Sequence, residues 1–111
     1  MTFETLRGPN AGMRPGKMPG SWYGTSRQSF LERTVTRAAL EAVFGAPTRD
    51  YGDCPMDDKV YAEWYVRFED GTVASIYDYR LRGDYRIGAY EDGPNATALV
   101  RAALGLPEET K

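Results

Sequence analysis

The sequence of 111 residues contains no histidine, and this absence removes the commonest general base and the commonest metal ligand together. Serine–histidine and cysteine–histidine catalysis and ordinary zinc sites are therefore not expected. Cysteine is almost as scarce: Cys54 is the single one, so no intrachain disulfide forms and a reducing compartment is favoured. The composition predicts no catalytic residue, no bound metal and no cofactor.

Long apolar runs are absent too. No run approaches the roughly 18 residues of a membrane span, and the N-terminus lacks the apolar core of a signal peptide. We therefore expect a cytoplasmic protein that makes no contact with a membrane. With 41% hydrophobic residues, a chain of this length has enough apolar surface for one modest core.

Positive and negative charges occupy different parts of the chain. Residues 1–38 contain six Arg and Lys against two Glu, a net charge of +4, and the net −2 of the whole chain leaves −6 for residues 39–111. Within the basic part, the segment GPNAGMRPGKMPGSWYG is rich in glycine and proline, which favours turns and extended chain. We predict an N-terminal arm over residues 1–28, either flexible or covering a partner, and a small α+β domain over residues 29–111.

Helix and strand patterns are clearer in the domain. Thr36 is suited to cap a helix over residues 37–45, and an apolar stripe predicts a second helix near residues 95–104. Residues 29–35 fit a helix or a strand, and we favour extended chain. With a hairpin over residues 60–80 and a third strand around residues 85–90, the expected fold is a three-stranded antiparallel sheet with two helices on one face (α-β-β-β-α).

Asp70-Gly71 predicts the turn of that hairpin, because both residues accept the positive φ of a two-residue loop. The resulting register places Glu63 directly opposite Asp78, at a distance of about 5 Å, where like charges repel by about 1 kcal/mol in water and by about 3 kcal/mol at an effective dielectric constant of ~20. A sheet arginine (Arg67, Arg80 or Arg86), a basic residue of the arm or a divalent cation would neutralise the pair. A shared proton, as in an acid–base dyad, is a further alternative.

The same face of the hairpin carries tyrosine and arginine. With residues from the third strand and the arm, the predicted binding surface comprises Tyr61, Tyr65, Arg67, Ile76, Arg80, Arg86, Tyr90, Trp22 and Tyr23. Tyrosine and arginine are enriched in protein interfaces, so we interpret this set as a surface for another protein. The alternative is that the arm covers it. Stacking of nucleobases on these rings is disfavoured by the acidic charge of the domain.

Three segments carry a resemblance to known sequences: LEAVFGAPTRDYGD, VYAEWYVRFEDGTVASIYDYR and RIGAYEDGPNATALVRAALG. Over about residues 37–105 the chain resembles small uncharacterised proteins of actinobacterial tailed phages and prophages. The resemblance implies a non-structural accessory protein in the cytoplasm of the host bacterium, and it supplies no reaction.

These features together favour a phage accessory protein that acts as a non-catalytic binding module for a host or phage protein. An open sheet edge would also allow a homodimer. The alternative is a sponge that captures a nucleotide-like small molecule between sheet and arm. A metal-dependent hydrolase that uses Glu63 and Asp78 is the least favoured hypothesis.

Overall fold

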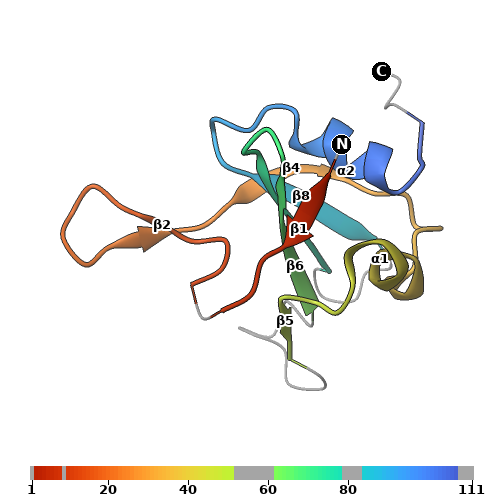
Figure 1. Cartoon of the computed structure of the whole chain (residues 1–111), viewed down its shortest axis with the longest axis horizontal. Helices are drawn as coiled ribbons and strands as arrows, with labels where there is room; N and C mark the ends of the chain where they lie inside the picture. The colour runs from red at the N-terminus through yellow and green to blue at the C-terminus, as the bar shows by residue number, and fades with distance from the viewer. Residues whose placement is uncertain (1, 9, 52–61, 79–83, 108–111) are drawn as a thin grey trace.

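The computed structural model describes residues 2–8, 10–51, 62–78 and 84–107. An antiparallel sheet forms the centre of the molecule, two short helices lie beside it, and a small hairpin projects from one end (Figure 1). The strands are β1 (Phe3–Thr5), β2 (Arg14–Pro15), β3 (Trp22–Tyr23), β4 (Ser26–Phe30), β5 (Arg49–Asp50), β6 (Ala62–Phe68), β7 (Val73–Asp78) and β8 (Tyr85–Ala89). The helices are α1 (Arg37–Phe44) and α2 (Ala96–Ala103).

The main sheet has six strands in the order β1-β6-β7-β8-β4, with β5 also paired to β6, and β2 and β3 form a separate two-stranded hairpin. The α+β class and the two helices are therefore confirmed, whereas the expected count of three strands is wrong. The added strands of the main sheet come from residues 3–30 and from the segment after α1. Glycine, proline and charged residues hide the two-residue alternation of a strand there, although the backbone still pairs.

The segment predicted as an N-terminal arm supplies strands to both edges of the main sheet. β1 lies beside β6 with Phe3 opposite Phe68, and Leu6 N donates to Tyr65 O at 2.7 Å. β4 begins at residue 26, before the predicted domain boundary at residue 29, and pairs with β8. Of residues 29–35, the first two are extended in β4 as predicted, and a turn follows at residues 33–34.

The hairpin of β6 and β7 has a three-residue loop in place of the predicted two-residue turn. Gly71 N donates to Phe68 O at 2.9 Å and Gly71 has a φ of +91°, so a β-turn is followed by a glycine in the left-handed region. The extra loop residue moves the register by one, and Glu63 lies opposite Tyr77. Such a shift turns every side chain of β7 to the other face. Ile76, predicted on the tyrosine face, is therefore fully buried in the core.

One apolar core lies between the sheet and the helices. Its fully buried members include Trp64, Val66, Ile76 and Ile87 from the sheet, and Leu40 and Val100 from the helices. Thr36 caps α1 as predicted, since Ala39 N donates to Thr36 Oγ1 at 3.1 Å. Trp64 Nε1 donates to Gly45 O at 2.9 Å and joins the end of α1 to β6. Because these sheet residues share one face, both helices lie on that face, as predicted.

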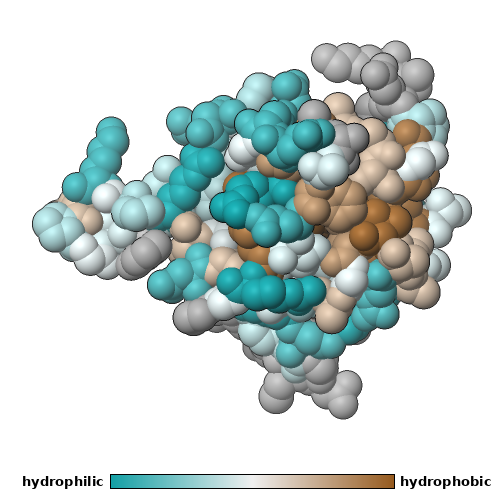
Figure 2. Space-filling model, viewed as in Figure 1, coloured by the Kyte–Doolittle hydropathy of each residue, from teal (hydrophilic) through white to brown (hydrophobic). Residues whose placement is uncertain are grey.

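The projecting hairpin lies away from the main hydrophobic region of the molecule. In Figure 2 the hydrophobic side chains gather on the side where α1 and α2 lie, and the hairpin extends away from them at the left of the view. In the described ranges, neither helix has the length and apolar character needed to cross a membrane.

Candidate functional site

The predicted binding surface lies on the sheet face that points away from the helices. We call this the outer face. Strand alternation places on it Phe30, Glu63, Tyr65, Arg67, Ser75, Tyr77 and Arg86. Two predicted members of the surface, Tyr61 and Arg80, lie outside the described residues.

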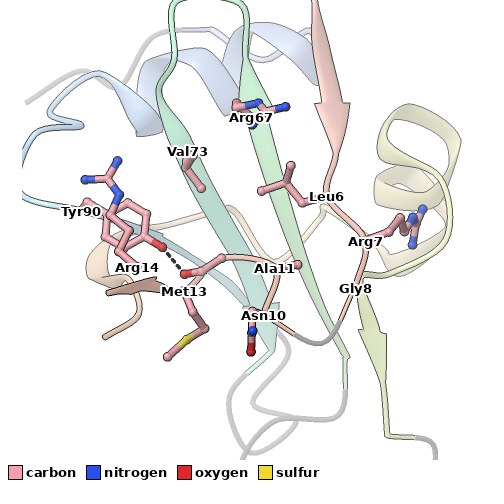
Figure 3. A pocket seen from close by; sticks show the side chains of 11 residues that line it. Leu6, Arg7, Gly8, Asn10, Ala11, Met13, Arg14, Arg67, Val73 and Tyr90 are labelled. Carbon is pink, nitrogen blue, oxygen red and sulfur yellow. Dashed lines mark hydrogen bonds between the residues drawn. The ribbon is translucent and has the colours of Figure 1, made fainter. Parts of the chain in front are cut away.

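Residues 10–14 cover part of the outer face. Tyr65 and Tyr90 are only 8% and 7% exposed, so neither offers its ring to a partner. Gly12, with a φ of +80°, packs so closely that a Cβ atom there would lie 2.0 Å from Tyr65 Cδ1. The Tyr90 hydroxyl donates to Gly12 O, as Figure 3 shows. For these two tyrosines, cover by the N-terminal segment, the alternative weighed for the sequence, is the observed arrangement.

Arg14, at the base of the β2–β3 hairpin, contacts two residues that follow β8. Its Cζ atom lies 3.8 Å from the centre of the Tyr90 ring, and its Nη1 donates to both carboxylate oxygens of Asp92 at 3.0 and 2.9 Å. Tyr23 meets Tyr90 edge-on, with 5.7 Å between ring centres. The hydrogen bond to Asp92 raises the pKa of Arg14, and burial raises the pKa of Tyr90. The charge of Arg14 is therefore neutralised within the chain.

Glu63 and Asp78 do not form the predicted pair of opposed carboxylates. The three-residue loop places Glu63 opposite Tyr77 and turns Asp78 to the other face of the sheet. Asp78 is 8% exposed, and its Oδ1 accepts a hydrogen bond from Ala62 N at 3.0 Å. A cation or a proton shared between these two carboxylates does not fit this geometry, which corrects the dyad, the cation site and the hydrolase hypothesis built on them.

Glu63 is neutralised by an arginine that the sequence did not indicate. Arg49 of β5 forms an ion pair with Glu63 at 3.2 Å, and the Tyr51 hydroxyl donates to the same carboxylate oxygen at 3.1 Å. Arg49 Cζ also lies 5.4 Å from the centre of the Tyr65 ring. Burial, with a smaller effect of the Glu63 charge, raises the pKa of Tyr65 to about 12. No strand was predicted between the helix that ends at residue 45 and the hairpin that begins at residue 60, so Arg49 had no strand position from which to be considered.

The other predicted residues are dispersed. Arg67 is exposed and forms an ion pair with Glu4 of β1. Arg86 is half-buried on β8, beside Phe30. Trp22 belongs to β3, and Tyr23 in the same strand is 47% exposed. The predicted surface is therefore divided between a covered part and residues that remain accessible.

Exposed large hydrophobic side chains are few in the part of the chain that the structure describes. Among the described residues, the large hydrophobic side chains that remain exposed are Met18 (74%), Tyr23 (47%) and Phe30 (41%). Met18 lies in the loop of the β2–β3 hairpin and Phe30 ends the edge strand β4. Sequence reasoning missed Met18 and Phe30. The glycine and proline residues around Met18 were a turn signal that could have placed it at a hairpin tip.

Two cavities flank the docked N-terminal segment. One, of about 650 Å³, lies between the hairpin and the turn after β8, with Arg14, Lys17, Tyr23, Tyr90 and Asp92 in its wall. The other, of about 460 Å³, is bounded by the covering segment and by Arg67 and Val73 of the sheet (Figure 3). Among the described residues, the wall of the first cavity has two cations, Arg14 and Lys17, and two carboxylates, Glu91 and Asp92. The described wall of the second has arginine side chains and no carboxylate.

Within residues 2–8, 10–51, 62–78 and 84–107, no group of three or more Cys, Asp or Glu side chains is arranged to hold a metal ion. Comparison of the chain with protein-family models, with curated proteins and with solved structures returns no match. The geometry of the described residues is therefore the basis for a functional proposal.

Proposed function

We propose that the protein is a non-catalytic binding module for another protein of a bacterial host or of a phage. The observation that carries this proposal is the projecting β2–β3 hairpin, which presents the exposed side chains of Met18 and Tyr23 (Figure 1). Methionine and tyrosine are enriched in protein interfaces, and an element that projects from the sheet can bring them into contact with another protein.

The projecting hairpin is suited to a protein partner. Its base is held by the Arg14–Asp92 ion pair and its two strands pair at Arg14–Tyr23 and Pro15–Trp22. The loop is closed by hydrogen bonds from Gly16 N to Ser21 O at 2.8 Å and from Ser21 N to Met18 O at 3.1 Å. A loop ordered before binding loses less conformational entropy on association than a flexible one. Met18 is thus presented as a pre-formed apolar contact.

Affinity capture from the lysate of an actinobacterial host tests the proposal. We expect the wild-type chain to retain one defined protein, and Met18→Ser to retain less of it because the exposed thioether contact is lost. Replacing residues 17–20 with Asn-Gly keeps the hairpin but removes its tip, and we expect this variant to lose the captured protein. Ala42→Ser, on the exposed face of α1, is the matched control. Equal recovery of every protein by all four chains contradicts the proposal.

A second candidate function is capture of a nucleotide-like small molecule. The cavity of about 650 Å³ favours it, because Lys17 and Tyr23 in its wall offer a cation and an exposed ring to a phosphate and a base. Native mass spectrometry of gently purified protein distinguishes the two functions. A retained small mass that Lys17→Ala and Tyr23→Ala both release supports the small-molecule function, and a bare chain that still captures a protein excludes it.

A further inference from the structure

The two edges of the main sheet differ in whether a further strand pairs with them. On one side, β6 is covered by two short strands, β1 and β5. On the other side the strand order ends at β4, and no other strand in the described ranges pairs with its outer edge. Four of the five residues of β4 are exposed. An exposed edge of this kind is a template for a strand from another chain.

The backbone of Phe30 points outward from this edge. Leu31 N donates to Tyr85 O at 2.8 Å, so Leu31 directs its backbone toward β8. Successive residues of an antiparallel strand direct their backbone groups to opposite sides, and Phe30, opposite Arg86, therefore directs its N–H and C=O away from β8. The register shift before Ser29 keeps the available ladder short. Side chains must supply much of the specificity.

Two guanidinium groups lie close to the Phe30 ring. Arg27 Cζ is 5.0 Å and Arg86 Cζ is 5.1 Å from the ring centre, and the residue is 41% exposed. Arg27 comes from β4 and Arg86 from β8, and both lie on the outer face. A guanidinium group such as that of Arg27 binds a carboxylate with well-defined geometry, and the exposed ring beside it favours an apolar side chain next to the acid.

We propose that β4 binds an extended acidic segment of a partner protein as an added strand. The Phe30 N–H and C=O pair with the backbone of that segment, and one of its apolar side chains covers the Phe30 ring. An Asp or Glu two residues away lies on the same face and meets Arg27. This inference depends on the proposed function as a protein-binding module, and it names the class of partner.

A second copy of this chain is a poorer occupant of the edge. Pairing of β4 with the same strand of a second copy would join two strands that each carry Arg27 and no carboxylate. Like charges on neighbouring strands are destabilising. An acidic segment is instead attracted by the positive charge of Arg27.

Selection of a random library of ten-residue peptides on the immobilised full chain tests the proposal. We expect the selected peptides to carry Asp or Glu at alternate positions around an apolar residue. We expect Arg27→Glu to bind a selected peptide about tenfold or more weakly than the wild type in fluorescence anisotropy. Methylation of those peptide nitrogens that face β4 is expected to abolish binding, and methylation of the alternate nitrogens is expected to leave it intact.

Phe30→Ala and Phe30→Pro form a matched pair of variants. Both remove the ring, but only proline removes the outward N–H, at an edge position where proline is tolerated. We expect weakened binding by Phe30→Ala and none by Phe30→Pro, with similar melting temperatures for the two. Peptides without acidic enrichment, or equal binding of both methylated forms, would overturn the proposal.

Two other occupants of the edge, single-stranded nucleic acid and a second copy of the chain, would each give a distinct experimental result. Displacement of the peptide by ten-residue oligothymidylate would assign the Phe30 cluster to single-stranded nucleic acid. A dimer in light scattering that Phe30→Pro dissociates would assign the edge to a second copy. Either result overturns the proposal of an acidic segment.

Failure of this inference can be separated from failure of the proposed function. The variant with residues 17–20 replaced keeps β4 intact, so it is expected to bind the selected peptides like the wild type. If Arg27→Glu and Phe30→Pro capture the lysate protein as well as the wild type, the inference about β4 fails and the hairpin-based function stands. If no chain captures a protein while the peptides bind, the hairpin-based function fails.

Discussion

At the scale of single residues, burial of Tyr65 makes stability depend on alkaline pH. Its pKa is raised to about 12, against the 10.0 of an exposed tyrosine, because the ring is desolvated under the N-terminal segment. The unfolded chain loses this proton near pH 10 and the folded chain does not, so the unfolded state binds fewer protons and stability falls as pH rises from 10 to 12. A difference of two pKa units corresponds to about 2–3 kcal/mol.

We therefore expect Tyr65→Phe to flatten this loss of stability, as measured by urea unfolding at pH 7, 9, 10.5 and 11.5. Between pH 7 and 9 both chains should show no dependence on this group, which supplies the internal control. Tyr85 and Tyr90, whose pKa values burial also raises, are expected to retain part of the alkaline loss in the variant. Identical alkaline slopes for the two chains would show that Tyr65 is not desolvated in the folded state.

At the scale of elements, α2 is capped by a residue far away in the sequence. Asn95, at the N-cap position, makes no side-chain capping bond. Gln28 Oε1 instead accepts from Thr97 N at 2.9 Å and from Thr97 Oγ1 at 2.6 Å, and Gln28 Nε2 donates to Gly93 O at 3.2 Å. A residue in the bulge of β4 thus holds the start of the helix against the sheet.

Gln28→Ala is expected to lower the unfolding free energy by about 1 kcal/mol, the usual cost of a lost helix cap, measured by urea denaturation. Gln28→Glu keeps the acceptor for Thr97 and places a negative charge at the helix N-terminus, but it loses the donor to Gly93 O, so its stability should fall between that of the wild type and that of Gln28→Ala. If alanine and glutamate behave alike, the bond to Thr97 does not stabilise α2.

Docking of the N-terminal segment depends on one glycine. Gly12 combines a φ of +80° with a hypothetical Cβ position 2.0 Å from the Tyr65 ring. Gly20 has nearly the same φ, +77°, with nothing within 4 Å of its hypothetical Cβ. Substitution of alanine at both positions therefore separates the free-energy cost of the positive φ from the cost of the steric clash with Tyr65.

We expect Gly20→Ala to cost about 1–2 kcal/mol through φ alone. Gly12→Ala should cost more and detach the segment, so residues 10–16 should lose protection in hydrogen exchange measured by mass spectrometry. Loss of protection in both variants, or in neither, would contradict a specific contact between Gly12 and Tyr65.

The hairpin of β6 and β7 shows where local sequence stops determining structure. Asp70-Gly71 predicts a tight turn, and the turn lies at these residues. The same dipeptide also fits a three-residue loop, because Asp70 Oδ1 accepts from Thr72 N at 2.9 Å and Gly71 adopts the positive φ that such a loop requires. Burial of Ile76 opposite Trp64 decides between the two registers, and that is a property of the assembled core.

At the scale of the whole molecule, the helices were predictable and the sheet edges were not. Thr36 and the apolar stripe of residues 96–104 specify α1 and α2 locally. β1 and β5 are two or three residues long and exist only because β6 offers an edge. The candidate site is likewise only partly predictable from the sequence. Tyr23 and Arg86 were identified from residue type, whereas Met18 and Phe30 were identified only from the three-dimensional structure.

The domain predicted from the sequence, residues 29–111, should not fold without the N-terminal segment. A chain of residues 29–111 lacks β1 and the first three residues of β4, and it uncovers Tyr65 and Tyr90. The edge of β6 that faced β1 is then open, and so is much of β8 where it faced β4, and open edges promote association between chains. We expect this chain to unfold without a cooperative transition and to elute as aggregates in size-exclusion chromatography.

The full chain with residues 17–20 replaced by Asn-Gly is the control for that experiment. It shortens the projecting hairpin and keeps β1, β4 and the Gly12 contact, so it should elute like the wild type and show a cooperative melt close to that of the wild type. A monomeric and cooperative chain of residues 29–111 would mean that the N-terminal segment stabilises nothing. It would then be free to leave the outer face, and Tyr65 and Tyr90 would return to the accessible surface as residues for a partner to bind.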